Sequence, residues 1–589
     1  MLTKRATLAL FATRALFSLA SPVNSFTIQV TVQDSGLALK SDDTCGDNAL
    51  TAPRGPEDPE VKLDAGTFIG TEKGNTHQFL GIPFAYPPTG DRRLRQPEAL
   101  PPYEGYNYIV QRYGNSCPQQ AFTLPEAFDK VPQLGKAING IYSDIMRDAE
   151  DCLTVNVVKP ADANPDANYP VLVWIYGGGF EIGGPSTYDG GKVVERSIEL
   201  KQPVIYVSIN YRLSALGFLP GRQVKDEKVG NLGLQDQRVA LRWVQKYISK
   251  FGGDPSKVTI WGESAGAISV AMQMITNKGN NENLFRGGVM QSGGPIPVGD
   301  IENGQRYYDF MVEKTGCKGR ADTLDCLRKV PYATYKKAMD ESPNMFSYQA
   351  LMLAWLPRVD GVFLTEPPQH SVIRGNVANV PIITGNCDDE GSLFSFSSKN
   401  VTTNAELKDY MKQYMMWNAT DSEIDLLLKH YPDDQRAGSP FDTGYDNAFS
   451  PQFKRIAALQ GDFVFHSPRR LLLERVAGKQ KSWGFIHKRG KDIPFAGAFH
   501  GSDLVNSFAK LEPTKLSDLL NYIIWFTNKL DPNGDTRSGP KLTWPQWDPL
   551  KPKALIFQDD ILFPRVIGDD NYRTDAMQFM KNISLIRRI

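Results

Sequence analysis

A serine between two glycines stands where a strand is expected to turn into a helix, in Gly262-Glu263-Ser264-Ala265-Gly266. The apolar run Val258–Trp261 precedes it, and apolar residues at helical spacing follow from Ile268 to Ile275. Such a strand–turn–helix lifts a serine hydroxyl above a sheet, where it can act as a nucleophile. The glycines leave room for strand and helix to cross, and the amide of Ala265 would point at a developing oxyanion. A glycine-rich turn without chemistry is the weaker interpretation in this context.

A serine nucleophile needs a general base, and histidine is the side chain whose pKa suits that role near neutrality. Six histidines are available: His77, His370, His430, His466, His487 and His500. The catalytic histidine is expected to follow the serine in the chain, which excludes His77, and the position of His370 excludes that residue too. His430 and His466 fall in expected helices, and His487 falls in an expected strand. His500 alone lies in a loop of small residues after an expected strand, where catalytic groups of parallel sheets gather.

The carboxylate that orients the histidine should lie between Ser264 and His500, just past a strand. The run Pro381–Gly385 leads into Asn386-Cys387-Asp388-Asp389-Glu390-Gly391, a cluster of three carboxylates. Spacing alone does not choose between Asp389 and Glu390. A solvated acidic turn would be the default interpretation if this cluster stood by itself.

A triple glycine, Gly177-Gly178-Gly179, directly follows the apolar run Val171–Tyr176. Glycine lets backbone amides approach a substrate closely, so these residues are expected to help form an oxyanion hole rather than a plain flexible turn.

The elements that must position these groups alternate along the chain from Val61 onward. Near-continuous apolar runs predict strands buried on both faces. They are Val171–Tyr176, Pro203–Ile209, Val258–Trp261, Pro381–Ile383, Trp483–Ile486 and Ala554–Phe557. Residues 234–251 show helical spacing between two of them. The pattern predicts an α/β fold with one doubly wound, mostly parallel sheet, flanked by helices and carrying long insertions.

Composition excludes several classes of protein. The 589 residues include 66 basic and 66 acidic side chains, so the chain lacks the cationic surface that nucleic-acid binding needs. There is no apolar stretch of about 18 residues that could span a bilayer. Cysteine and histidine spacing does not fit a zinc site, so we expect no metal and no cofactor.

The ends of the chain suggest secretion. Residues 1–20 resemble a signal peptide, with two basic residues before an apolar run, although Arg14 interrupts that run and a buried N-terminal helix is the alternative. Residues 21–60 form a polar lead-in that we expect to be poorly ordered. We expect residues 61–589 to form a single domain. Three glycosylation sequons agree with an extracellular protein: Asn400, Asn418 and Asn582.

Ordered motifs along most of the chain resemble the type-B carboxylesterase/lipase family of α/β-hydrolases, above all its fungal secreted lipases and sterol esterases. They are Phe79–Ala85, Glu150–Val157, Asn210–Leu213, Gly230–Gln237, Phe251–Pro255 and Phe499–Asp503. The resemblance implies a catalytic triad of Ser264, Glu390 and His500, which selects Glu390 over Asp389. It also implies oxyanion donors at Gly178, Gly179 and Ala265. The disulfides it implies are Cys117–Cys152 and Cys317–Cys326, and Cys45 and Cys387 are left over.

The loop between Cys117 and Cys152 covers the active-site gorge in that family. Here two apolar series recur at i, i+4, i+7: Leu124, Phe128 and Val131, then Leu134, Ile138, Ile141 and Ile145. An amphipathic segment tethered at both ends suits a mobile lid that contacts lipid transiently. A fixed helix packed on the core fits equally well.

The expected substrate is an uncharged small-molecule ester. Cholinesterases place a cation-binding tryptophan in the Cys117–Cys152 loop, and this loop has none, which disfavours choline esters. We therefore expect a lipase or sterol esterase for long-chain acyl esters, acting as a monomer or homodimer. A short-chain or phenolic-ester (feruloyl-type) esterase is the alternative. A non-catalytic adhesion protein of this fold is remote, because all three triad positions are filled.

Overall fold

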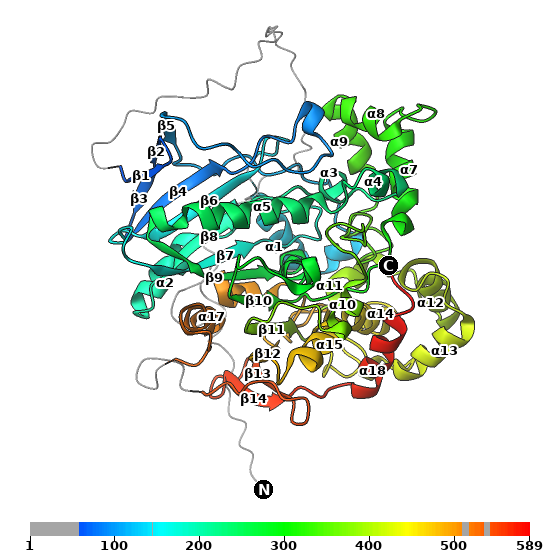
Figure 1. Ribbon diagram of the computed structural model, residues 1–589. Helices are drawn as coiled ribbons and strands as arrows, with labels where there is room; N and C mark the ends of the chain where they lie inside the picture. Colours follow the sequence, from blue (N-terminus) through cyan, green and yellow to red (C-terminus); the bar gives the residue numbers. More distant parts are fainter. Residues whose placement is uncertain (1–57, 144, 146, 509–517, 535–541) are drawn as a thin grey trace, which may run out of the picture. The chain divides into compact units, whose positions relative to one another are not determined.

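The computed structural model describes residues 58–143, 145, 147–508, 518–534 and 542–589 (Figure 1). The expected signal peptide, nearly all of the lead-in and Cys45 lie outside the described residues. The first strand, β1 (Glu60–Leu63), pairs with β2 (Gly66–Ile69) in a small sheet that β5 (Asn107–Ile109) completes. Among the described residues, no helix is both long and apolar enough to cross a membrane.

An 11-stranded sheet forms the centre of the fold, in the order β14-β13-β12-β11-β10-β9-β7-β8-β6-β4-β3. The seven strands from β13 to β8 in this order all run parallel, and the strands at the two ends pair antiparallel. Their bounds are β3 Thr71–Lys73, β4 Thr76–Pro83, β6 Thr154–Pro160, β7 Tyr169–Ile175, β8 Ile205–Ile209, β9 Gly253–Glu263, β10 Gly287–Gln291, β11 Ile382–Cys387, β12 Ser482–His487, β13 Lys553–Phe557 and β14 Arg565–Asp569. The predicted mostly parallel α/β sheet is confirmed.

Most of the parallel strands form where the sequence is nearly continuously apolar, because helices cover both faces of the sheet and bury these side chains. Every residue of β8, β11 and β12 is buried. Helix α5 (Leu232–Tyr247) packs against α6 (Ala265–Ile275) and β9, and α2 (Gly190–Glu199) packs with α17 (Asp518–Lys529) against other strands (Figure 1). The helix expected over 234–251 is α5 with a 3₁₀ turn, Ile248–Phe251, at its end.

Parallel strands bring their carboxyl ends to one edge of the sheet. Ser264 directly follows β9, Glu390 lies shortly after β11, and His500 lies in the loop that follows β12. The register pairs Cys387 at the end of β11 with His487 at the end of β12. Three residues separated by more than a hundred positions each are thereby placed at the same edge.

The Cys117–Cys152 loop is closed by a disulfide, and a second disulfide joins Cys317 to Cys326. The loop contains a 3₁₀ helix, Glu126–Lys130, and then α1 (Pro132–Ser143). Its apolar side chains Phe128, Val131, Leu134 and Ile138 are buried, and Leu124 and Ile145 are half-buried. The side chain of Ile141 lies outside the described residues. The first of the two expected helical series thus contains a 3₁₀ helix in place of an α-helix, and the second begins in α1. The buried apolar side chains of both series face inward.

Candidate active site

Ser264 occupies a strained turn between β9 and α6. Its φ of 55° and ψ of −124° are rarely adopted by non-glycine residues, and its amide donates to the carbonyl of Gln291 at 2.9 Å. A Cβ on Gly266 would lie 1.9 Å from the carbonyl oxygen of Ile175, and one on Gly262 would lie 2.4 Å from the Gly266 backbone. Both glycines are therefore required for the close crossing of strand and helix, as the sequence predicts.

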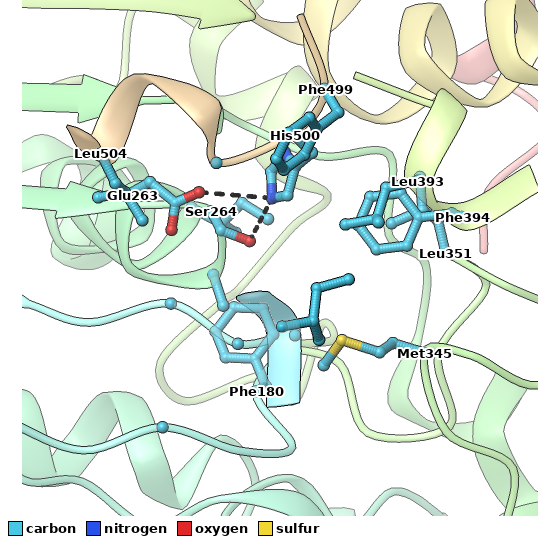
Figure 2. Close-up of a pocket in the computed structure, with 18 of the residues that line it drawn as sticks. Phe180, Glu263, Ser264, Met345, Leu351, Leu393, Phe394, Phe499, His500 and Leu504 are labelled. Carbon is cyan, nitrogen blue, oxygen red and sulfur yellow. Dashed lines mark hydrogen bonds and ion pairs between the residues drawn. The ribbon is translucent and has the colours of Figure 1, made fainter. Parts of the chain in front are cut away.

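His500 connects this serine to a carboxylate. Its Nε2 lies 2.8 Å from Ser264 Oγ (Figure 2), and its Nδ1 lies 2.5 Å from Glu390 Oε2. The other oxygen of Glu390 accepts from the amide of Cys387 at 2.9 Å and from the side chain of Asn386 at 3.1 Å. This chain of contacts can take a proton from the serine and hold the resulting imidazolium.

Asp389, the competing carboxylate, is directed elsewhere. Its Oδ1 accepts from the Phe441 amide at 2.7 Å and the Ser439 hydroxyl at 3.0 Å. Its Oδ2 accepts from the Lys491 ammonium at 2.7 Å and from the Ala498 amide at 2.9 Å. Asp389 thus fixes the loop that carries His500 without touching the imidazole.

The environment of His500 favours its charged form. Burial of the ring, which packs on Phe394 and Phe465, lowers its pKa, but the charge and hydrogen bond of Glu390 raise it. Glu263 and Asp503 add to that attraction, and the net result is a His500 pKa above its ordinary value.

Two buried carboxyls next to the histidine were not predicted from the sequence. Glu263 Oε1 lies 3.6 Å from His500 Nε2 (Figure 2), and burial raises the Glu263 pKa to about 8. Burial likewise raises the pKa of Asp503 to about 6, and its Oδ2 accepts from the side chain of Gln291 at 2.8 Å. Glu263 directly precedes Ser264 and Asp503 lies three residues after His500, and this closeness to residues that the sequence does identify was the available signal.

The glycine loop after β7 lies beside Ser264. Gly178 and Gly179 have φ values of 105° and 63°, and a Cβ on Gly178 would lie 2.2 Å from the carbonyl oxygen of Ile182. The amides of Gly178, Gly179 and Ala265 have no acceptor among the described residues, and all three residues line the same cavity as the serine. These amides are available to a substrate oxygen.

Glu181 anchors that loop, which the sequence did not reveal. Its amide donates to Gly178 O at 3.0 Å, its carbonyl accepts from the Gln120 amide at 2.9 Å, and its Oε2 accepts from the Met345 amide at 2.8 Å. Burial raises the Glu181 pKa to about 8. The backbone of Glu181 thereby connects the glycine loop to the Cys117–Cys152 loop, and its buried carboxyl connects it to Met345 in the wall of the cavity.

The cavity above Ser264 and His500 has a volume of about 330 Å³ and an almost wholly apolar wall. Figure 2 shows Leu351, Leu393 and Phe394 across from the serine and histidine, with Phe180 and Met345 nearby. Leu134, Ile138 and Ile145 of the Cys117–Cys152 loop close part of it. An apolar pocket with a few convergent polar groups is the usual form of a small-molecule site.

None of the other five histidines lines the cavity that contains Ser264, although His487 Nδ1 lies 3.2 Å from the hydroxyl of Ser502 in its wall. His466 and His487 are buried, and burial lowers the pKa of His466 well below its ordinary value and that of His487 to about 3. His430 ends α13 (Asp421–His430), His370 lies in α10 (Pro368–Arg374), and His77 lies in β4. The three sequon asparagines, Asn400, Asn418 and Asn582, are exposed.

Known proteins share much of this sequence and its fold. The model of the carboxylesterase family matches residues 57–559. Secreted lipase 1 of Botryotinia fuckeliana is 40% identical over 83% of this chain and 87% of that protein. Lipase 4 of Diutina rugosa is 40% identical over 86% of this chain and 93% of that protein. A secreted triacylglycerol lipase, LIP1, of Gibberella zeae is 38% identical over 88% of this chain and 89% of that protein. The crystal structure of EstA from Aspergillus niger matches with a TM-score of 0.75 and 25% identity, covering 90% of this chain and 99% of that one. The chain therefore belongs to the carboxylesterase family, as its motifs predict.

Proposed function

We propose that this carboxylic ester hydrolase is a lipase or sterol esterase that cleaves long-chain acyl esters. The observation that carries the proposal is the apolar cavity of about 330 Å³, which contains both Ser264 and His500. Its wall offers a long acyl chain extensive apolar contact, and Asp189 and Glu263 are the acidic side chains among its described lining residues. The three relatives named above are called lipases, which supports the same substrate class.

In the proposed mechanism, Ser264 Oγ attacks the ester carbonyl while His500 Nε2 accepts the serine proton. Glu390 orients the imidazole through Nδ1 and stabilises its positive charge. The amides of Gly178, Gly179 and Ala265 donate to the oxyanion.

The tetrahedral intermediate then collapses. Its carbon–oxygen bond to the alcohol breaks, and the alcohol leaves with the proton from His500. Water attacks the acyl-enzyme with His500 again as base, which releases the carboxylic acid and restores the serine.

The Cys117–Cys152 loop is proposed to act as a lid. In the structure its side chains Leu134 and Ile138 line the cavity, and both are buried. If the loop swings outward while its disulfide holds both ends, these side chains and the cavity wall become available to a lipid surface.

We also propose that the protein is extracellular, with a signal peptide at 1–20, a lead-in at 21–60 and one catalytic domain at 61–589. The exposed sequons and two disulfides fit that compartment, and two of the relatives are named as secreted. Glycosylation at Asn400, Asn418 and Asn582, and a monomeric or homodimeric state, belong to the same proposal.

The test is a substrate panel of p-nitrophenyl esters with C4, C8 and C16 chains, together with cholesteryl oleate and a feruloyl ester. We expect higher kcat/KM on C8 and C16 than on C4, and no hydrolysis by Ser264→Ala. Ser256→Ala, near the opposite end of β9, is the matched control and should retain activity. Strict C4 or feruloyl preference would contradict the long-chain assignment, and activity in Ser264→Ala would contradict the triad.

A further inference from the structure

We propose that the apolar tip of the β13–β14 hairpin, Ile561-Leu562-Phe563, is an anchor that docks the catalytic edge of the sheet on a neutral lipid surface. The proposal rests on the proposed function, because a long-chain ester is presented at such a surface.

The hairpin tip is apolar and open to solvent. Ile561 is 94% exposed, Leu562 81% and Phe563 62%. Single exposed apolar residues are common on protein surfaces and need no explanation. Within the described part of the chain, however, no other run of three consecutive large apolar side chains is exposed. A contiguous apolar tip of this kind indicates a contact surface.

The backbone of the tip is held in a defined shape. The amides of Leu562 and Phe563 both donate to Asp560 Oδ1 at 2.8 Å. Below the tip, the Gln558 amide donates to Pro564 O at 3.1 Å and the Gln558 side chain donates to Phe563 O at 2.8 Å. A preformed loop loses little conformational entropy when it binds, so the three side chains are presented ready for contact.

The base of the hairpin is connected to the segment that leads to His500. Arg489 donates to Gln558 O at 3.3 Å and to Pro564 O at 3.2 Å, and the Gly490 amide donates to Asp559 Oδ2 at 2.8 Å. Residues 489–490 follow β12 and begin the loop that carries the histidine. The position of the tip relative to the catalytic groups is therefore fixed by hydrogen bonds.

The tip also lies at the edge of the sheet where the parallel strands have their carboxyl ends. β13 runs parallel to β12, so the turn after Phe557 emerges at the same edge as the turn after Glu263 (Figure 1). The order β9-β10-β11-β12-β13 places four strand spacings between them, or about 19 Å. A lipid surface that touches the tip would lie next to the edge at which Ser264 opens.

The charges around the tip favour an uncharged surface. Two carboxylates, Asp559 and Asp560, directly precede it, and the tip itself carries no basic residue. The nearest cation along the chain, Arg565, lies 3.5 Å from Asp518. Attachment to anionic lipid requires basic side chains near the apolar ones, whereas a neutral ester or zwitterionic surface requires only the apolar contact.

The experiment measures flotation of the protein with triolein droplets coated with phosphatidylcholine. Binding is measured in the Ser264→Ala background, so that hydrolysis does not change the surface. The test variant is I561S/L562S/F563S, and the matched control is Leu550→Ser. Leu550 is 88% exposed but precedes β13, at the opposite end of the strand.

We expect the triple variant to lose at least tenfold in droplet binding, and Leu550→Ser to bind normally. With Ser264 restored, kcat/KM of the triple variant on dissolved p-nitrophenyl butyrate should stay within twofold, which also shows that it folds. Unchanged droplet binding, or an equal loss in Leu550→Ser, would overturn the proposal. So would tighter binding to phosphatidylglycerol than to phosphatidylcholine vesicles.

Two further outcomes separate this proposal from its alternatives. If sedimentation shows a dimer that the triple variant converts to monomer while droplet binding is intact, the tip is an interface between copies and the lipid proposal fails. If the enzyme ignores long-chain esters but its droplet binding depends on the tip, the proposed substrate fails and the anchor stands.

Discussion

Replacement of Glu263 by glutamine should abolish a pH-dependent loss of stability that originates next to Ser264, the proposed nucleophile. Burial holds the pKa of this carboxyl at about 8, against 4.5 for an ordinary glutamate. Below pH 4.5 the group is protonated in both the folded and the unfolded chain and contributes nothing to the pH dependence. Between pH 4.5 and about 8 the unfolded chain releases a proton that the folded chain keeps, so stability falls as the pH rises.

The magnitude follows from the two pKa values. A pKa difference of one corresponds to about 1.4 kcal/mol, so the change from 4.5 to about 8 amounts to about 5 kcal/mol once the pH exceeds 8. Unfolding entropy is about 2.1 cal/mol/K per residue, or about 1.1 kcal/mol/K for a domain of roughly 530 residues. The full effect therefore shifts Tm by about 4 °C.

The assay is thermal denaturation of wild type and Glu263→Gln from pH 4.5 to pH 9 at constant ionic strength. Their Tm difference should rise in favour of the variant by about 4 °C across this range. Any fixed cost of burying the amide shifts all points equally, so the slope is the measurement. Glu313→Gln, at a glutamate whose side chain is 66% exposed, should give a flat difference. A flat or falling difference for Glu263→Gln would refute the reasoning.

Two other substitutions separate catalysis from packing. Glu390→Gln should lower kcat by about 10³- to 10⁴-fold with little change in Tm, because the amide no longer stabilises the His500 imidazolium. Asp389→Asn should do the reverse, losing about 3 kcal/mol of stability by breaking a buried ion pair while the folded enzyme keeps most of its kcat. Equal kcat losses in the two variants, measured by stopped assay below their Tm, would contradict these roles. Gly266→Ala should prevent folding or cost more than 3 kcal/mol, because its Cβ would lie 1.9 Å from a backbone oxygen of β7. Gly105→Ala, whose Cβ would meet only one atom at 3.8 Å, should unfold in urea as the wild type does.

The sheet could be predicted wherever strand formation depends on burial alone. β7, β8 and β12 contain near-continuous apolar runs in the sequence and are buried at almost every position. β10 was not predicted, since its sequence Gly-Gly-Val-Met-Gln lacks an apolar run although all five residues are buried. It forms a strand because β9 and β11 provide hydrogen-bonding partners on both sides, and pairing of this kind is not encoded locally.

Some residues of the candidate site could likewise be predicted from local sequence, whereas others could not. Ser264 follows from local rules, because the turn itself requires glycines on both sides of it. His500 follows from exclusion of five other histidines. The choice of Glu390 over Asp389 does not follow from spacing, because adjacent residues differ only in which way their side chains point. Contacts with Lys491 and the backbone of residues 441 and 498 turn Asp389 away, and these partners are distant in sequence.

Four buried carboxyls around one imidazole therefore have distinct physical states, although their residue types are nearly identical. Glu390 accepts two hydrogen bonds on one oxygen and faces His500 with the other, so its contacts suit a charged acceptor. Asp389 is paired with Lys491 and fixes the histidine loop. Among the described residues, Glu263 and Asp503 have no cationic partner other than the histidine, and burial raises their pKa values to about 8 and about 6. Because burial keeps the Glu263 carboxyl mostly protonated near neutral pH, the imidazole faces fewer negative charges than four carboxylates would supply, which helps it to accept and return a proton.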